Sequence, residues 1–102
     1  MLAKRFKLPI QSFVGKKGKI TKNLFFLVKI FVPASLQSRF GVTISAKTAA
    51  KAVDRNRIKR SVYDFLAKVK DKLPVADYWI SILPPAADLP KEKFMEQLVK
   101  LF

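Results

Sequence analysis

Residues 51–63 read KAVDRNRIKRSVY, and the rest of the chain is organised around this run. From Ile58 onward, large apolar residues recur at intervals of three and four, which is the spacing of one face of an α-helix. The spacing predicts a helix over roughly residues 53–72 with this apolar stripe turned inward. Arg57 and Arg60 fall on the opposite side of such a helix, so both are expected to point outward. The stripe consists of Ile58, Val62, Phe65, Leu66, Val69 and Leu73.

Arginine is concentrated at the start of this helix. Arg55, Arg57 and Arg60 are three of the five arginines in the chain, and the other cations are lysines. A solvated helix face is the ordinary explanation of a charged run, but the planar guanidinium group is the side chain that binds a phosphate diester through two hydrogen bonds. The concentration of arginine therefore favours a phosphate-binding face, with Asp54 as an N-cap or first-turn acid beside it.

The net charge of +14 lies entirely in the N-terminal part of the chain. Residues 1–60 contain fifteen Lys or Arg against one acidic residue, whereas residues 61–102 contain six of each sign. Such one-sided charge suits a polyanionic partner, whose condensed counterions are released when protein cations replace them. Charge alone leaves three classes open: an RNA-binding subunit, a basic ribosomal protein, and a membrane-surface or nucleoid-binding protein.

The remaining pattern predicts a single α+β domain over residues 1–102, with a mobile basic N-terminus at residues 1–7. With the helix described above, the expected element order is α-β-β-β-α-β-α, which predicts a two-layer sandwich. In the second strand, alternation puts Lys29 on the same face as Phe25, Leu27 and Phe31, and the cation marks this face as the open one. The other expected elements are a short helix over 8–14, strands over 19–23, 24–32, 40–45 and 78–83, and a closing helix over 90–102.

The composition offers little for catalysis by the protein. The chain has no cysteine and no histidine, so it lacks thiolate ligands, disulfides and the commonest general base. Of the seven carboxylates, only Asp88, Glu92 and Glu96 share a helical spacing, and acids in that position suit the positive end of the closing helix. No apolar run reaches transmembrane length and none resembles a signal sequence, so a cytoplasmic location is expected.

Two segments carry a specific signature. Residues 39–47 read RFGVTISAK, and residues 52–60 read AVDRNRIKR. A strand of the form R-x-G-hydrophobic-S/T-hydrophobic-S-x-K, followed by a helix of the form A-V-x-R-N-R-h-K-R, is the signature of the protein subunit of bacterial ribonuclease P, which the chain resembles closely over residues 39–66. The resemblance has three departures: Phe13 is the only aromatic residue in a short first helix, Tyr63 stands where another arginine is common, and Leu83-Pro84-Pro85 replaces an arginine after the last strand.

The resemblance implies both a fold and a function. The family fold has the same element order, is similar to one domain of a ribosomal protein, and contains a left-handed crossover around the arginine helix. The family's protein joins a catalytic RNA to form ribonuclease P, an endoribonuclease that removes 5′ leaders from precursor tRNA. The RNA carries the catalysis and binds most of the Mg²⁺ of the holoenzyme, and the protein has no metal site of its own. The implied partners are the catalytic RNA and precursor tRNA with its 5′ leader; neither DNA nor a membrane is expected.

The residues and the resemblance together point to two surfaces, with no catalytic residue in the protein itself. The residues expected to face the backbone of the catalytic RNA are Lys47, Lys51, Arg55, Asn56, Arg57, Lys59 and Arg60. The residues expected to line a cleft for the leader are Phe13, Phe25, Lys29, Thr43 and Ser45. For the two aromatic residues, packing in the core is an alternative that the sequence leaves open.

Overall fold

The computed structural model describes residues 6–33 and 36–102, and a four-stranded sheet lies at its centre. The strands lie in the order β1-β2-β4-β3, with β3 and β4 parallel and the other neighbours antiparallel. The strands are β1 (Lys19–Lys22), β2 (Phe26–Phe31), β3 (Arg39–Ile44) and β4 (Asp77–Ile82). The helices are α1 (Ala52–Val69) and α2 (Lys91–Val99), and the 3-10 segments are η2 (Ile10–Phe13), η3 (Lys70–Lys72) and η4 (Pro84–Asp88).

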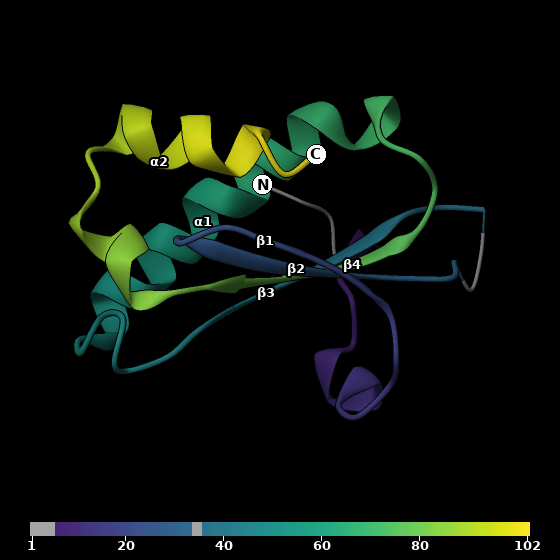
Figure 1. Ribbon diagram of the computed structural model, residues 1–102, viewed down its shortest axis with the longest axis horizontal. Helices are drawn as coiled ribbons and strands as arrows, with labels where there is room; N and C mark the ends of the chain where they lie inside the picture. The colour runs from purple at the N-terminus through teal and green to yellow at the C-terminus, as the bar shows by residue number, and fades with distance from the viewer. Residues whose placement is uncertain (1–5, 34–35) are drawn as a thin grey trace.

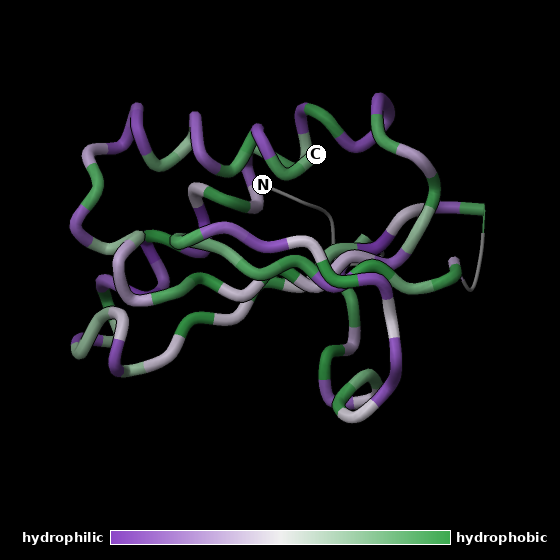
Figure 2. The backbone as a smooth tube through the Cα atoms, in the orientation of Figure 1, coloured by the Kyte–Doolittle hydropathy of each residue, from purple (hydrophilic) through white to green (hydrophobic). Residues whose placement is uncertain are grey.

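Both α-helices cover one face of the sheet, and η2 lies on the other side (Figure 1). Val62 and Leu66 of α1 and Phe94 and Leu98 of α2 are buried against the strands. Burial of each such side chain stabilises the fold by about 1.5–3 kcal/mol relative to exposure. Along α2 the outer side is hydrophilic and the side toward the sheet is hydrophobic (Figure 2). The predicted α+β sandwich and the inward apolar stripe are confirmed. The strand residues of this core are Phe26, Val28, Phe40, Val42, Tyr78, Ile80 and Ile82.

Alternation along β2 separates the two faces as predicted. Val28 is fully buried beneath the helices, whereas Lys29 is half-buried on the opposite face. Continued over the whole predicted strand 24–32, the same alternation would put Leu24 and Val32 on the buried face, but both are exposed. Both lie beyond the ends of β2, so the strand's alternation does not reach them.

A second, smaller cluster covers one end of the opposite face. Leu8 and Phe13 from the N-terminal segment pack against Phe31 of β2, which the sequence pattern had placed on the open face. Ile10 lies directly over Gly41, where a Cβ atom would come within 2.6 Å of the Ile10 Cγ1 atom. Glycine is therefore required at this position of β3 because the N-terminal segment crosses so closely above it.

Some element boundaries differ from those predicted. The predicted helix over residues 53–72 is α-helical only over Ala52–Val69 and ends in the tighter turn η3. The predicted helix over 8–14 is reduced to the single 3-10 turn η2. The segment η4 was not predicted; Pro84 and Pro85 end the strand but their constrained φ also suits the first turn of a short helix.

The N-terminal segment is part of the fold from Phe6 onward in the described chain. Lys7 forms a parallel bridge with Phe40, and the Leu8 backbone N–H donates to the Phe40 carbonyl at 2.8 Å. Lys7 is therefore held against β3 and does not belong to a mobile N-terminus, contrary to the prediction. The rest of the predicted mobile N-terminus, residues 1–5, lies outside the described residues.

The segment β3-α1-β4 is a crossover between parallel neighbours, and its left-handedness stays a prediction. None of the helices within residues 6–33 and 36–102 combines the length and hydropathy needed to span a bilayer.

Candidate nucleic-acid interface

The outward placement of Arg57 and Arg60 on α1 is confirmed. Both are exposed, and the Arg57 side chain keeps 75% of its surface in solvent. Among the described residues, its ion pair runs from Nη2 to the Asp54 Oδ1 atom at 3.4 Å, and the pair is weak because Arg57 is exposed and Asp54 is half-exposed. Asp54 is a first-turn acid and not the N-cap, which is Lys51. Two guanidinium groups thus stand one turn apart on the outer side of the helix, available to an anionic partner.

Arg55 has a different position from the other two arginines. Its Nη1 atom donates hydrogen bonds to the carbonyls of Ala49 and Ala50, at 2.9 and 2.8 Å. These bonds fold the guanidinium back onto the loop of residues 45–51, which joins β3 to α1. Arg55 therefore acts first as a positioning residue for this loop, and only its remaining N–H groups are left for a phosphate.

The remaining predicted RNA-facing residues lie around the same end of α1. We call the exposed set the arginine face; it consists of Lys47, Lys51, Asn56, Arg57 and Arg60. Lys59 is half-buried at its margin, as expected from its place beside the apolar stripe. The Thr48 hydroxyl donates to the Ile82 carbonyl at 3.3 Å, which ties the loop bearing Lys47 to the end of β4. The exposed motif residues thus all lie in the loop before α1 or in the first three turns of that helix.

Tyr63 joins α1 to the outer edge of the sheet. The Val42 backbone N–H donates to the Tyr63 hydroxyl at 3.2 Å. Among the described residues, β3 is an edge strand, and this N–H lies on its outer side. Burial raises the pKa of the Tyr63 phenol, and the hydrogen bond from Val42 opposes this rise. The Lys7 Nζ atom lies 5.1 Å from the ring centroid. Tyr63, which stands where another arginine is common in the family, thus links the edge strand β3 to α1.

The face of the sheet opposite the helices carries a polar group around Trp79. The Lys29 Nζ atom lies 5.2 Å from the Trp79 ring centroid, and the two residues are register partners on β2 and β4. The indole N–H donates to the Thr43 hydroxyl at 3.0 Å, and that hydroxyl lies 3.2 Å from the Ser81 hydroxyl. We call this surface the open face; it consists of Leu27, Lys29, Thr43, Trp79 and Ser81.

Phe13 borders the open face through its contacts in the second cluster. Its ring lies 5.0 Å from that of Phe31 in an edge-to-face arrangement, and Trp79 packs against the same cluster. The Lys16 Nζ atom and the Arg39 Cζ atom lie 4.6 and 5.6 Å from the Phe13 ring centroid. Phe13 is buried, so its ring packs within this cluster and is not exposed for stacking on a base.

Two predicted cleft residues do not join this group. Phe25 is half-buried and packs against the main core beneath the helices. The Asn23 side-chain oxygen accepts hydrogen bonds from the backbone N–H groups of Phe25 and Phe26. The turn that these bonds form interrupts the strand alternation from which Phe25 was predicted to lie on the open face. Ser45 is exposed beyond β3, and its hydroxyl lies 3.3 Å from that of Thr48 within the loop.

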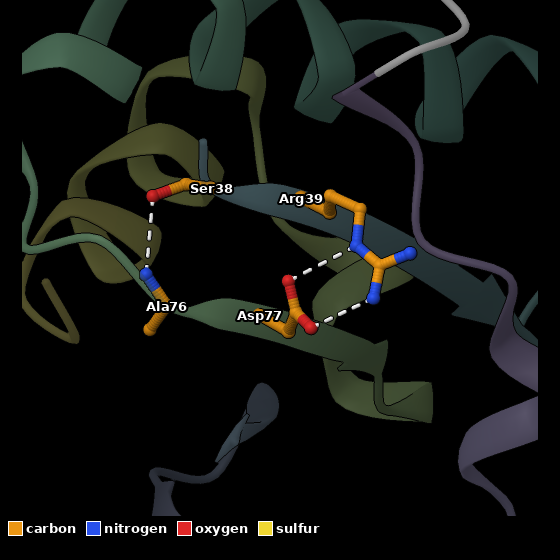
Figure 3. Close-up of polar contacts among 4 residues, drawn as sticks. All are labelled: Ser38, Arg39, Ala76 and Asp77. Atoms are coloured by element: carbon orange, nitrogen blue, oxygen red, sulfur yellow. Dashed lines mark hydrogen bonds and ion pairs between the residues drawn. The ribbon is translucent and has the colours of Figure 1, made fainter. Parts of the chain in front are cut away.

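Arg39, the first residue of the strand motif, makes a structural ion pair. Its Nε and Nη2 atoms donate to the two carboxylate oxygens of Asp77 at 3.2 and 2.9 Å (Figure 3). This pairing raises the pKa of the Arg39 guanidinium against the opposing effect of burial. Beside it, the Ser38 hydroxyl accepts the Ala76 backbone N–H at 3.2 Å. These bonds hold β3 and β4 together at the end where both strands begin.

Sequence reasoning missed Trp79 as a site residue, although a signal was present. In the strand predicted over 78–83, alternation separates Trp79 and Ser81 from Tyr78, Ile80 and Ile82, which are buried beneath the helices. The hydrogen bond from Val42 to Tyr63 had no such signal, because it joins residues that are adjacent only after α1 has packed on the sheet.

Across residues 6–33 and 36–102, no three carboxylate side chains come close enough together to hold a metal ion. The polar groups that do converge are cations, hydroxyls and one indole, which bind anions and aromatic rings.

Fold and surface together define a small, strongly basic α+β protein with an arginine-bearing helix on one side of a sheet and an open face on the other. The family model described as ribonuclease P matches residues 9–102. The chain is 36% identical over 91 residues to the ribonuclease P protein component of Synechocystis, covering 87% of this chain and 73% of that protein. It is 32% identical over 91 residues to the component from Bacillus cereus, covering 87% and 78%. The chain belongs to the ribonuclease P protein family.

Solved structures agree with this assignment at the level of the fold. The ribonuclease P protein of Staphylococcus aureus superposes with a TM-score of 0.84 at 23% identity, covering 94% of this chain and 91% of that one. The Thermotoga maritima protein in complex with 1-(4-fluorophenyl)-2-thiourea also gives 0.84 at 23% identity, covering 93% and 95%. Family membership supports a part in ribonuclease P, in tRNA processing, and in partnership with RNA.

Proposed function

We propose that the chain is the protein subunit of ribonuclease P, that its arginine face binds the catalytic RNA, and that its open face holds the 5′ leader of precursor tRNA. One observation carries most of the proposal: Arg57 and Arg60 project from α1 while the inner side of the same helix, at Val62 and Leu66, is buried in the core. The helix is rigidly held, so its outer cations are presented in a fixed arrangement that suits a folded polyanion.

The chemistry in this proposal belongs to the RNA. The catalytic RNA would bind most of the Mg²⁺ and carry out hydrolysis, and the protein would neutralise phosphates and place the substrate. The open face suits a single strand because Lys29 supplies a cation for the backbone and Trp79 supplies aromatic surface, while Thr43 and Ser81 add hydroxyl groups. The cytoplasm, where precursor tRNA is made in bacteria, is the proposed location.

The two surfaces are close enough in the chain to act on one RNA assembly. Thr43 lies on β3 immediately before the loop of residues 45–51, and that loop leads directly into the first turn of α1. Arg55 binds the loop at Ala49 and Ala50, and Thr48 ties the middle of the loop to the Ile82 carbonyl. An RNA strand leaving the open face at Thr43 would therefore meet the loop cations Lys47 and Lys51 before the arginines.

The proposal is tested by reconstitution with rigorously RNA-free protein, the catalytic RNA of the same organism and precursor tRNA. The protein alone is expected to cleave nothing, the RNA alone to be slow at low Mg²⁺, and the mixture to cleave at the 5′ maturation site. Sequencing the RNA that co-purifies with the protein from its own cells gives an independent measurement. Nuclease activity in the RNA-free protein, or enrichment of ribosomal RNA in place of the catalytic RNA, would contradict the proposal.

A further inference from the structure

A groove runs between α1, η4 and the start of α2, on the helix-covered side of the molecule. Its volume is about 360 Å³, which lies at the small end of the range of about 300–1,000 Å³ that is usual for ligand sites. Its apolar lining includes Ile58 of α1, Leu89 after η4, and Phe94 and Met95 of α2. The groove is separate from the open face, because the sheet lies between the two.

The rim of the groove is cationic. Arg57 stands on the α1 side and Lys91 on the α2 side, and no acidic residue is among those that line the groove. Ser61 adds a hydroxyl, which donates to the Arg57 carbonyl at 3.2 Å and keeps its oxygen available as an acceptor. The weak contact of Arg57 with Asp54 can be exchanged for a phosphate at little cost, because it is a single 3.4 Å pair between an exposed arginine and a half-exposed carboxylate.

This combination of an apolar floor and two rim cations matches one ligand chemistry. An unpaired nucleotide has an apolar, planar base and a phosphate on either side of it, whereas a paired nucleotide in a duplex cannot expose its base. An apolar peptide helix or an uncharged lipid chain would use the apolar floor but would leave both rim cations without an anionic partner. Arg57 also belongs to the arginine face, so the groove continues the proposed RNA-binding surface.

We propose that this groove binds one unpaired nucleotide of the RNA partner, with its base against Ile58 and Met95 and its flanking phosphates on Arg57 and Lys91. This inference rests on the proposed function for the identity of the RNA. The groove gives the arginine helix a means of recognising a bulged or looped position in that RNA, which phosphate contacts alone do not provide.

Met95 allows the groove to be observed directly in the free protein. The chain has only two methionines, Met1 and Met95, so methyl labelling of methionine gives two NMR signals, one of which reports from the groove. Titration with each of the four nucleoside monophosphates is expected to shift the Met95 signal in a saturable way. Ribose 5-phosphate, which has no base, is expected to leave that signal nearly unchanged.

Two pairs of variants test the site and its rim. Ala87→Trp fills the groove from an exposed lining position, and Val99→Trp adds the same ring at an exposed position of α2 outside the lining. Lys91→Gln removes a rim cation, and Lys93→Gln removes a neighbouring exposed cation that does not line the groove. Circular dichroism and melting temperature establish that each variant folds.

The expected outcome is specific to the groove members of each pair. Ala87→Trp should abolish the nucleotide-dependent Met95 shift and weaken catalytic RNA binding by about fivefold or more, the value of one base contact, while Val99→Trp should do neither. Lys91→Gln should flatten the dependence of log affinity on log salt by about 0.7–0.9, and Lys93→Gln should change it much less.

The inference is overturned if no nucleotide shifts Met95 saturably, or if Ala87→Trp and Val99→Trp bind the RNA equally well. Either result would leave the reconstitution of ribonuclease P activity untouched, so failure of the groove and failure of the proposed function are distinguishable. If ribose 5-phosphate shifts Met95 as strongly as the nucleotides do, the site is a phosphate site only and the assignment of the base is wrong.

Discussion

Arg39 and Asp77 face each other across the parallel strands β3 and β4 and are joined by two hydrogen bonds of 3.2 and 2.9 Å. Asp77 is fully buried, whereas the Arg39 side chain keeps 24% of its surface in solvent. The strand motif that carries the family resemblance thus begins with an arginine whose guanidinium is already paired within the protein. Its role is to close the β3–β4 pair, and it is not among the arginines proposed to bind RNA.

Replacement of Arg39 should therefore destabilise the fold. Arg39→Leu leaves the Asp77 carboxylate buried without its partner, which should lower the free energy of unfolding by about 3 kcal/mol. The double variant Arg39→Leu with Asp77→Asn should recover part of this loss because no unpaired charge remains. Urea unfolding at pH 7 measures both. Arg60→Leu, an arginine on the exposed face, serves as the control and should change stability by less than about 0.5 kcal/mol.

The arginine face should act on RNA binding rather than on stability. Arg57→Ala combined with Arg60→Ala should weaken catalytic RNA binding and flatten the dependence of log affinity on log salt by up to roughly 2, since each phosphate contact contributes about 0.7–0.9. The matched control is Lys68→Ala with Lys72→Ala, which removes the same charge from exposed positions at the other end of the helical segment. Equal salt slopes for the two double variants would show that only net charge matters.

The open face should respond to the leader. Lys29→Ala should lower the affinity of the holoenzyme for precursor tRNA that carries a leader and should leave mature tRNA binding nearly unchanged, because only the leader would reach this face. The register pairs Lys19 with Ile30, which puts Lys19 on the helix-covered side of β1, so Lys19→Ala is the matched control. Comparable losses with both tRNAs would mean that the leader lies elsewhere.

Tyr63 should stabilise the edge of the sheet. Tyr63→Phe removes the acceptor of the buried Val42 N–H, which should cost about 1 kcal/mol and speed amide hydrogen exchange at Val42 in particular. The pKa of Tyr63 is raised in the folded protein, so the unfolded chain loses the phenolic proton first as pH rises above about 10. The contribution of Tyr63 to stability is therefore full below that pH and is lost above it. The difference in unfolding free energy between the wild type and Tyr63→Phe, measured from pH 8 upward, should therefore shrink. A constant difference would contradict the assignment.

Much of the fold was accessible from local pattern. The three-and-four spacing after Ile58 predicted which side of α1 is buried, and the alternation around Lys29 predicted the two faces of β2. Both patterns repeat over several residues within one element, so one-residue errors at the ends did not change the result. The outward placement of Arg57 and Arg60 followed from the same periodicity.

What sequence by itself determined, then, is the set of elements, their inward and outward sides, the location of the excess charge, and the motif that carries the family resemblance. Only the tertiary structure decided that Arg55 turns back onto Ala49 and Ala50, that Phe13 is buried against Phe31, and that Trp79 bridges Lys29 and Thr43. The physical reason is that side-chain partners are chosen by proximity across elements, and a hydrogen bond or ring contact between distant residues leaves no periodic trace in the chain. The groove beside Met95 is of the same kind, since its walls come from α1, η4 and α2 and exist only when these three pack together.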